Sequence, residues 1–249
     1  QNTIVIFIGD NGRCNVRGKG YLFEPGINIP LLIYNPFSKE NKVINDLVTV
    51  TDLTATILNY AGIDKPKYMT GNSFLKDDFN RKYVYAARDQ WDEIMDKSRA
   101  IVTKKWKYIR NYKPEIPYDA GQAYLEFYRP AVHIMRTAKS KNLLTNAQLH
   151  FFKESKDLEE LYDLENDPHE INNLALDPSF QNVMNKFRID MEEYNERYRP
   201  MSDEYEPIIA ESVVILEWVK KNRPEEYKRM LDGYEIGFSK SKDEYYKNN

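Results

Sequence analysis

An unbroken apolar run at residues 3–8, Thr-Ile-Val-Ile-Phe-Ile, constrains the fold of this chain more than any other feature. Gly-Asp-Asn-Gly follows at residues 9–12. A short continuous apolar run bounded by turn residues is typical of a strand buried on both faces of a parallel sheet. Such a strand needs neighbours on both sides, so we expect the chain to begin in the middle of a fold, with more of that fold upstream.

The next segments alternate between strand and helix patterns. Residues 29–34 form a second apolar run, and residues 46–61 carry apolar side chains at helical spacing. Gly62 is placed to end that helix. A third short strand is expected at 83–87. Strands and helices in this order predict an α/β fold.

From about residue 99 the continuous apolar runs give way to alternating ones. Residues 99–112 predict a β-hairpin, and residues 160–164 predict another strand. Helical patterns are expected at 146–154, 180–198 and 207–221. We therefore predict two parts: residues 1–98 in an α/β domain, and residues 99–249 in a smaller subdomain with an antiparallel sheet and helices.

Composition excludes several classes of protein. The 36 Lys and Arg residues against 39 Asp and Glu give a net charge of −3, which argues against a nucleic-acid binder. No apolar run approaches the roughly 18 residues of a membrane-spanning helix. The single cysteine, Cys14, cannot form an internal disulfide, so the cysteine count does not distinguish an oxidising from a reducing compartment.

Asp10 and Asn11 are candidate metal ligands because they follow the first strand, where α/β sheets place their ligand sites. Carboxylate and amide oxygens suit Ca²⁺ or Mg²⁺. The same Asp-Asn-Gly sequence also favours an ordinary turn, which is the simpler interpretation from the residues alone.

Lys19 lies between two glycines, which let the backbone approach a ligand closely. Its ammonium is a compact charge for an anion, although a solvated loop lysine is the plain alternative. Arg17 is the second candidate for the same role. Four charged side chains follow the third strand: Arg88, Asp89, Asp92 and Glu93. Their groups suit sugar hydroxyls and sulfate, although a solvated run of charges explains them equally well.

Four segments, taken in order, resemble the type I sulfatase family of the alkaline phosphatase superfamily, in its heparan or glycosaminoglycan sulfatase-like branch. They are residues 3–12, residues 17–31, residues 88–93 with 105–111, and residues 160–170 with 173–175. The resemblance runs from residue 1 to about residue 200. It corresponds to the C-terminal portion of a family member.

The resemblance implies a partial alkaline-phosphatase-like α/β sandwich with a smaller C-terminal subdomain. It implies hydrolysis of a sulfate ester or sulfamate on a carbohydrate, with glycosaminoglycans as the expected substrates. Asp10 and Asn11 would bind Ca²⁺ or Mg²⁺. Lys19 would be catalytic, holding the sulfate and stabilising the leaving oxygen. The family is periplasmic, secreted or lysosomal.

The family nucleophile is a formylglycine made in a Cys-x-Pro-Ser-Arg motif, in which Ser can replace Cys. That motif is absent from these 249 residues, and Cys14 is followed by Asn-Val-Arg, which does not match it. We therefore expect the N-terminal half of the same fold to supply the nucleophile and the other metal ligands, and this polypeptide alone to be inactive.

Two alternatives stay open from the sequence. One is a non-catalytic carbohydrate-binding or interaction module. The other is a phosphoester or phosphonate hydrolase of the same superfamily. The formylglycine motif upstream of residue 1 would support the enzyme over the module.

Overall fold

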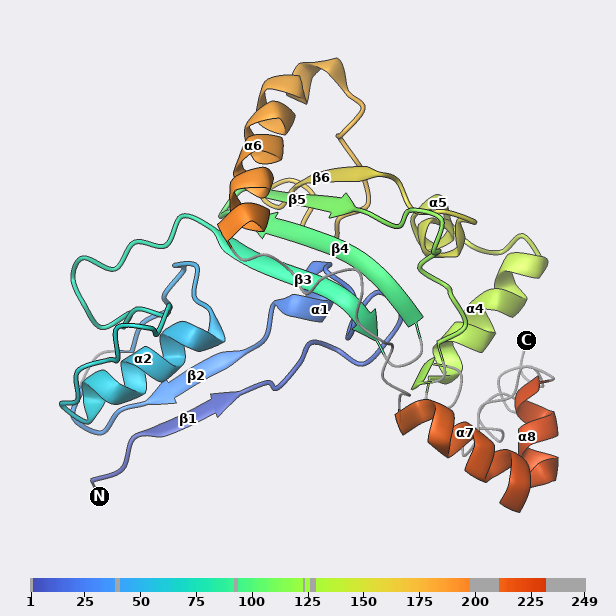
Figure 1. Ribbon diagram of the computed structural model, residues 1–249, viewed down its shortest axis with the longest axis horizontal. Helices are drawn as coiled ribbons and strands as arrows, with labels where there is room; N and C mark the ends of the chain where they lie inside the picture. The colour runs from blue at the N-terminus through green and yellow to red at the C-terminus, as the bar shows by residue number, and fades with distance from the viewer. Residues whose placement is uncertain are drawn as a thin grey trace.

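The computed structural model describes residues 2–38, 41–91, 94–122, 124–125, 129–197 and 211–231. Its described strands form two antiparallel sheets. The first pairs β1 (Val5–Ile8) with β2 (Leu31–Tyr34), and the second has the order β3 (Val84–Trp91), β4 (Ile94–Val102), β5 (Trp106–Asn111) and β6 (Glu159–Asp163). Figure 1 shows the β1–β2 pair at the left, the four-stranded sheet at the centre and helices around it. The predicted mixture of helices and strands is confirmed.

The β1–β2 pair differs from the sequence-based expectation. The two strands run antiparallel, with Val5 opposite Tyr34 and Ile8 opposite Leu31. Four of their side chains are more than half exposed: Val5, Phe7, Leu32 and Tyr34. The interpretation of residues 3–8 as a strand buried on both faces of a parallel sheet is therefore wrong for the described residues. A continuous apolar run places apolar side chains on both faces of a strand. The described part of the chain covers only one face of β1.

Helix α2 (Val50–Tyr60) confirms the helix predicted at 46–61 and begins four residues later. Thr49 and Asp52 form a capping box, in which the Thr49 backbone N–H donates to Asp52 Oδ2 at 2.9 Å. This box satisfies backbone groups that the first turn leaves unpaired, so it fixes the start of the helix. Gly62 follows the C-terminus with φ of 68°, a conformation that favours glycine.

The four-stranded sheet contains the predicted hairpin. In β4 and β5, Ser98 lies opposite Asn111 and Val102 lies opposite Lys107. β3 pairs with β4 through a register shift between Arg88 and Gln90. The antiparallel sheet therefore begins at Val84, and β4 crosses the predicted division after residue 98. The division into two domains stays a prediction.

Each face of this sheet is covered by a different part of the chain. Helix α6 (Gln181–Arg197) covers one face, and the helix predicted at 180–198 is confirmed. Its apolar side chains pack on Ile101, Tyr108 and Leu161. The loop that leads into α1 (Glu24–Ile27) covers the other face and packs Tyr21, Leu22 and Phe23 against Ala100, Ile109 and Tyr162. The sheet is thus the middle layer between a helix and the loop that carries Lys19.

Helix α4 (Pro130–Ser140) adds Val132 to the core cluster that the loop forms with the sheet. The other described helices are α5 (Asn146–Leu149), α7 (Glu211–Asn222) and α8 (Pro224–Leu231). The helix predicted at 146–154 is α5 followed by a 3₁₀ turn, His150–Phe152. The first four residues of the helix predicted at 207–221 lie outside the described residues. In the part of the chain that the structure describes, no helix is both long and apolar enough to cross a membrane.

Candidate active site

The loop after β1 folds back on itself through backbone hydrogen bonds. Arg13 organises it, because its N–H donates to the Pro25 carbonyl at 2.7 Å and its own carbonyl accepts from the Lys19 N–H at 2.7 Å. Gly12 N–H adds a bond to the Gly26 carbonyl at 3.2 Å. These bonds place the two predicted metal ligands and Lys19 on one compact loop.

The glycines beside Lys19 are required by packing inside the protein. A Cβ at Gly18 would lie 1.9 Å from the Arg13 carbonyl oxygen. Gly20 has φ of 86°, and a Cβ there would lie 2.1 Å from the Trp91 ring. From the sequence, these glycines are interpreted as allowing close approach of the backbone to a ligand. In the structure they let the loop close on itself and on β3.

Asp10 and Asn11 directly follow β1, as predicted. Asp10 is exposed and Asn11 is half-buried. The thiol of Cys14 donates to Asn11 Oδ1, with 3.3 Å between Sγ and Oδ1. Among the described residues, no three or more His, Cys, Asp or Glu side chains gather into a metal cage. The hard oxygens of Asp10 and Asn11 fit Ca²⁺ or Mg²⁺ but supply only part of the six to eight ligands that Ca²⁺ takes.

Lys19 and Cys14, the residue that donates to Asn11, are both neighbours of the Tyr124 side chain. The Lys19 ammonium lies over the Tyr124 ring, 4.9 Å from its centre, and no described carboxylate pairs with it. Arg129 donates to the Tyr124 hydroxyl and lies over the same ring at 4.8 Å. Burial and the neighbouring Cys14 side chain raise the pKa of Tyr124. Tyr124 was not predicted from the sequence, because it lies in a segment with no strand or helix periodicity.

Arg17 is used by the fold itself. Its backbone has φ of 62°, and its guanidinium donates to the carbonyl oxygens of His169 at 3.1 Å and Glu170 at 2.8 Å. The same group lies 3.9 Å from the centre of the Phe23 ring. Arg17 therefore joins the loop to the segment after β6. Its role as the alternative sulfate contact stays a prediction.

A buried ion cluster makes a second connection between this loop and the segment after β6. Lys107 of β5 is fully buried, and its ammonium lies 2.7 Å from Glu24 Oε1 and 2.8 Å from Glu170 Oε1. The Glu24 N–H also donates to Glu170 Oε2 at 2.6 Å. Burial raises the pKa of Glu170, and the nearby Lys107 ammonium opposes that rise. The cluster was not predicted, because its members come from three separate segments.

Arg88 of β3 holds the Lys19 loop through a hydrogen bond to its backbone. Its Nη1 donates to the Gly20 carbonyl at 2.8 Å, and its Nε lies 3.2 Å from Asp96 Oδ2. Lys156 binds the same carboxylate at 2.5 Å, and burial lowers the pKa of Lys156. The Arg88 side chain is only 6% exposed and holds the loop in place. A substrate contact for Arg88 stays a prediction.

The other charged residues after β3 were predicted as substrate contacts. Asp89 pairs with Arg99 at 2.7 Å and is 44% exposed, so one side of its carboxylate faces solvent. Asp92 and Glu93 lie outside the described residues. A substrate contact for these three stays a prediction.

Comparison with known proteins places this site in a family. A sequence profile described as N-sulphoglucosamine sulphohydrolase, C-terminal, matches residues 12–120 and 116–197. An ulvan-active sulfatase of Formosa agariphila is 35% identical over 198 residues, which cover 78% of this chain and 33% of that protein. The human N-sulphoglucosamine sulphohydrolase is 28% identical over 207 residues, covering 76% of this chain and 40% of that protein. The chain thus spans between a third and two fifths of the length of these relatives.

Solved structures agree on the fold. A 2-O glycosaminoglycan sulfatase superposes with a TM-score of 0.57 at 20% identity, covering 82% of this chain and 38% of that one. A protein solved with D-glucosamine-2-N,6-O-disulfate as its substrate gives a TM-score of 0.51 at 19% identity, covering 82% and 36%.

The fold is therefore the alkaline-phosphatase-like α/β fold of sulfatases, of which this chain holds a C-terminal part. The chain belongs to the family described as N-sulphoglucosamine sulphohydrolase, C-terminal.

Proposed function

We propose that this chain is the C-terminal part of a sulfatase that hydrolyses a sulfate ester or sulfamate on a carbohydrate. The observation that carries the proposal is the loop of residues 10–19, which holds Asp10, Asn11 and Lys19 together: Cys14 donates to Asn11 and lies beside Tyr124, whose ring the Lys19 ammonium faces. The names of the relatives support the substrate class, since they include an ulvan-active sulfatase and an N-sulphoglucosamine sulphohydrolase.

Each residue of the loop has a separate task in this reaction. Asp10 and Asn11 would hold a divalent cation, which polarises a sulfate oxygen when bound. Lys19 binds the sulfate and offsets the negative charge that grows on the leaving oxygen as the S–O bond breaks. The Lys19 ammonium lies 4.9 Å from the centre of the Tyr124 ring, a cation–π contact that leaves its positive charge available to an anion.

The exposed apolar side chains of β1 and β2 support a partner within the same fold. Val5, Phe7, Leu32 and Tyr34 are each between 52% and 62% exposed and lie on neighbouring paired strands. Contiguous apolar surface of this kind marks an interface. We assign it to the N-terminal part of a sulfatase, which would also supply the formylglycine nucleophile and the remaining metal ligands.

The first prediction concerns the 249-residue polypeptide alone. It should show no turnover of 4-methylumbelliferyl sulfate in the presence of Ca²⁺, because the nucleophile motif and most metal ligands are absent from its sequence. A fluorescence assay at high protein concentration measures this directly. Robust hydrolysis would overturn the assignment of the nucleophile to another part of the enzyme.

The second prediction concerns Asp10 in a full-length sulfatase carrying this chain. Asp10→Ala removes an anionic oxygen ligand, so Ca²⁺ affinity and activity should both fall, and excess Ca²⁺ should restore part of the activity. Asp64→Ala, at an exposed aspartate outside this loop, is the matched control and should leave the Ca²⁺ titration unchanged. A wild-type Ca²⁺ titration for Asp10→Ala would exclude Asp10 as a ligand.

A further inference from the structure

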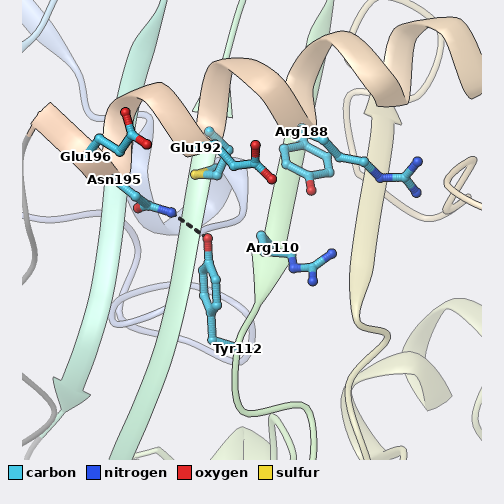
Figure 2. A pocket seen from close by; sticks show the side chains of 8 residues that line it. Arg110, Tyr112, Arg188, Glu192, Asn195 and Glu196 are labelled. Carbon is cyan, nitrogen blue, oxygen red and sulfur yellow. Dashed lines mark hydrogen bonds between the residues drawn. The ribbon is translucent and has the colours of Figure 1, made fainter.

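A hollow of about 390 Å³ lies between β5 and α6. Figure 2 shows that side chains from both elements point into it. It lies on the sheet face that α6 covers, and Lys19 belongs to the loop on the other face. Six of the residues that line it carry polar or charged groups: Arg110, Tyr112, Arg188, Glu192, Asn195 and Glu196.

Tyr112 offers an aromatic face that is held in place. Its hydroxyl accepts a hydrogen bond from Asn195 Nδ2 at 2.6 Å, and its side chain is 37% exposed. The Arg110 guanidinium lies 5.8 Å from the ring centre. The Lys97 ammonium also lies 5.7 Å from the ring centre. A ring fixed at its hydroxyl end and partly exposed is a stacking surface for a flat apolar group, such as the C–H face of a sugar ring.

The basic side of the hollow has one guanidinium charge in excess. Glu159 pairs with Arg188 in a fork, with 2.8 Å from Nε to Oε1 and 2.6 Å from Nη2 to Oε2. It also lies 3.1 Å from Arg110 Nη1. The Arg188 hydrogen bonds lower the pKa of Glu159 to about 2, so this carboxylate stays charged at neutral pH. One carboxylate shared by two guanidiniums leaves Arg110 with donors for a ligand.

The helix side of the hollow supplies acceptors. Glu192 and Glu196 are exposed and lie one turn apart on α6. Within the described residues neither carboxylate has an ion-pair partner. The hollow therefore combines an aromatic face with donors on one side and acceptors on the other, which matches the hydroxyl-rich edge of a sugar. The two carboxylates would repel a phosphate or a sulfate, so the sugar edge that faces them carries hydroxyls.

We propose that this hollow binds a sugar unit of the polysaccharide substrate at a second site, separate from the scissile sulfate. The proposal rests on the proposed function for its substrate class. The four-stranded sheet separates the hollow from Lys19, so a sugar bound there is not the one that reacts. Its binding would hold a long polymer on the enzyme and would contribute nothing to a small substrate.

The test compares a polymer with a small substrate, using a full-length sulfatase carrying this chain. KM is measured for ulvan and heparan sulfate and for 4-methylumbelliferyl sulfate, and retardation is measured in gels containing each polymer. Tyr112→Ala should raise the polymer KM by about tenfold, the scale of losing one well-placed aromatic contact. It should reduce retardation and leave the small-substrate kinetics unchanged. Tyr112→Phe keeps the ring and should keep most of the effect.

Two further variants keep the result decisive. Glu192→Gln changes an exposed side chain, so it should fold normally and weaken only polymer binding. Tyr68→Ala, at a tyrosine that is 86% exposed, is the matched control and should change neither substrate. Unchanged polymer KM and retardation for Tyr112→Ala and Glu192→Gln, or no retardation of the wild type in either gel, would overturn the second site. If the wild-type enzyme hydrolysed none of the three substrates, the proposed function would be refuted instead.

Discussion

Replacing Lys19 by alanine in a full-length sulfatase carrying this chain is expected to lower kcat by about 10² or more, the scale of losing one positioned electrostatic group. The ammonium acts on charge that develops in the transition state, so the loss should fall on kcat more than on KM. Asp10 and Asn11 are untouched, so added Ca²⁺ should not restore activity. Steady-state kinetics across a Ca²⁺ titration measure both effects.

Two comparisons make the Lys19 result specific. Lys19→Arg keeps the positive charge and can lie over the Tyr124 ring, so it should recover part of the loss although its shape differs. Lys42→Ala, at an exposed lysine, should keep normal kcat. If Lys19 were a solvated loop residue, all its variants would behave like that control. A Lys19→Ala enzyme within twofold of wild type would end the assignment.

The sequence predicted those elements whose side-chain pattern is local. The β4–β5 hairpin has alternating side chains, and α2 and α6 have helical spacing, so each could be located from its own residues. The prediction for β1 failed because its pattern describes a strand with two covered faces. Whether both faces are covered depends on residues far away or outside this chain, and no local pattern contains that information.

The two loop cations that were predicted to contact sulfate, Arg17 and Lys19, show a related limit. They are two residues apart and carry the same charge, so composition gave no physical reason to separate their roles. In the structure the positive φ of Arg17 turns its side chain toward the His169 and Glu170 carbonyls, whereas Lys19 faces Tyr124. The resemblance to sulfatases favours Lys19 for the sulfate contact, and the two hydrogen bonds of Arg17 to backbone carbonyls are the physical difference between the two cations.

The buried cluster around Lys107 had a weak sequence signal that could have been used. Lys107 alternates along β5 with Tyr108, so it lies on the same sheet face as Ile109, which packs in the core. A lysine on an inward strand position needs a buried carboxylate. The sequence alone does not say which carboxylate, because Glu24 and Glu170 are far from it along the chain.

This cluster couples the stability of the subdomain to the position of the candidate active site. Glu24 opens α1, directly after the loop that carries Lys19, and Glu170 lies in the segment that Arg17 also binds. Loss of the cluster should therefore loosen the loop as well as destabilise the fold. That places Lys107 among the positioning residues of the site.

Lys107→Met is expected to lower the free energy of unfolding of the full-length protein by about 3–5 kcal/mol at neutral pH, the cost of breaking a buried ion pair. The variant leaves the buried Glu170 carboxyl without the Lys107 ammonium, which opposes the rise of its pKa, so the pKa of Glu170 in the folded state should rise further above the unfolded value. Urea unfolding between about pH 4.5 and 7.5 measures the effect.

The sign of the pH dependence identifies the cause. A carboxyl whose folded pKa is raised binds its proton more tightly in the folded state, so the deficit of Lys107→Met should shrink as the pH falls toward the unfolded pKa of about 4.3 and grow as it rises. Met184→Ala, on the buried apolar face of α6, is the matched control. Its cost of about 2–5 kcal/mol comes from a cavity without charge and should not change with pH. A pH-independent deficit for Lys107→Met would mean that Lys107 stabilises the fold by packing alone.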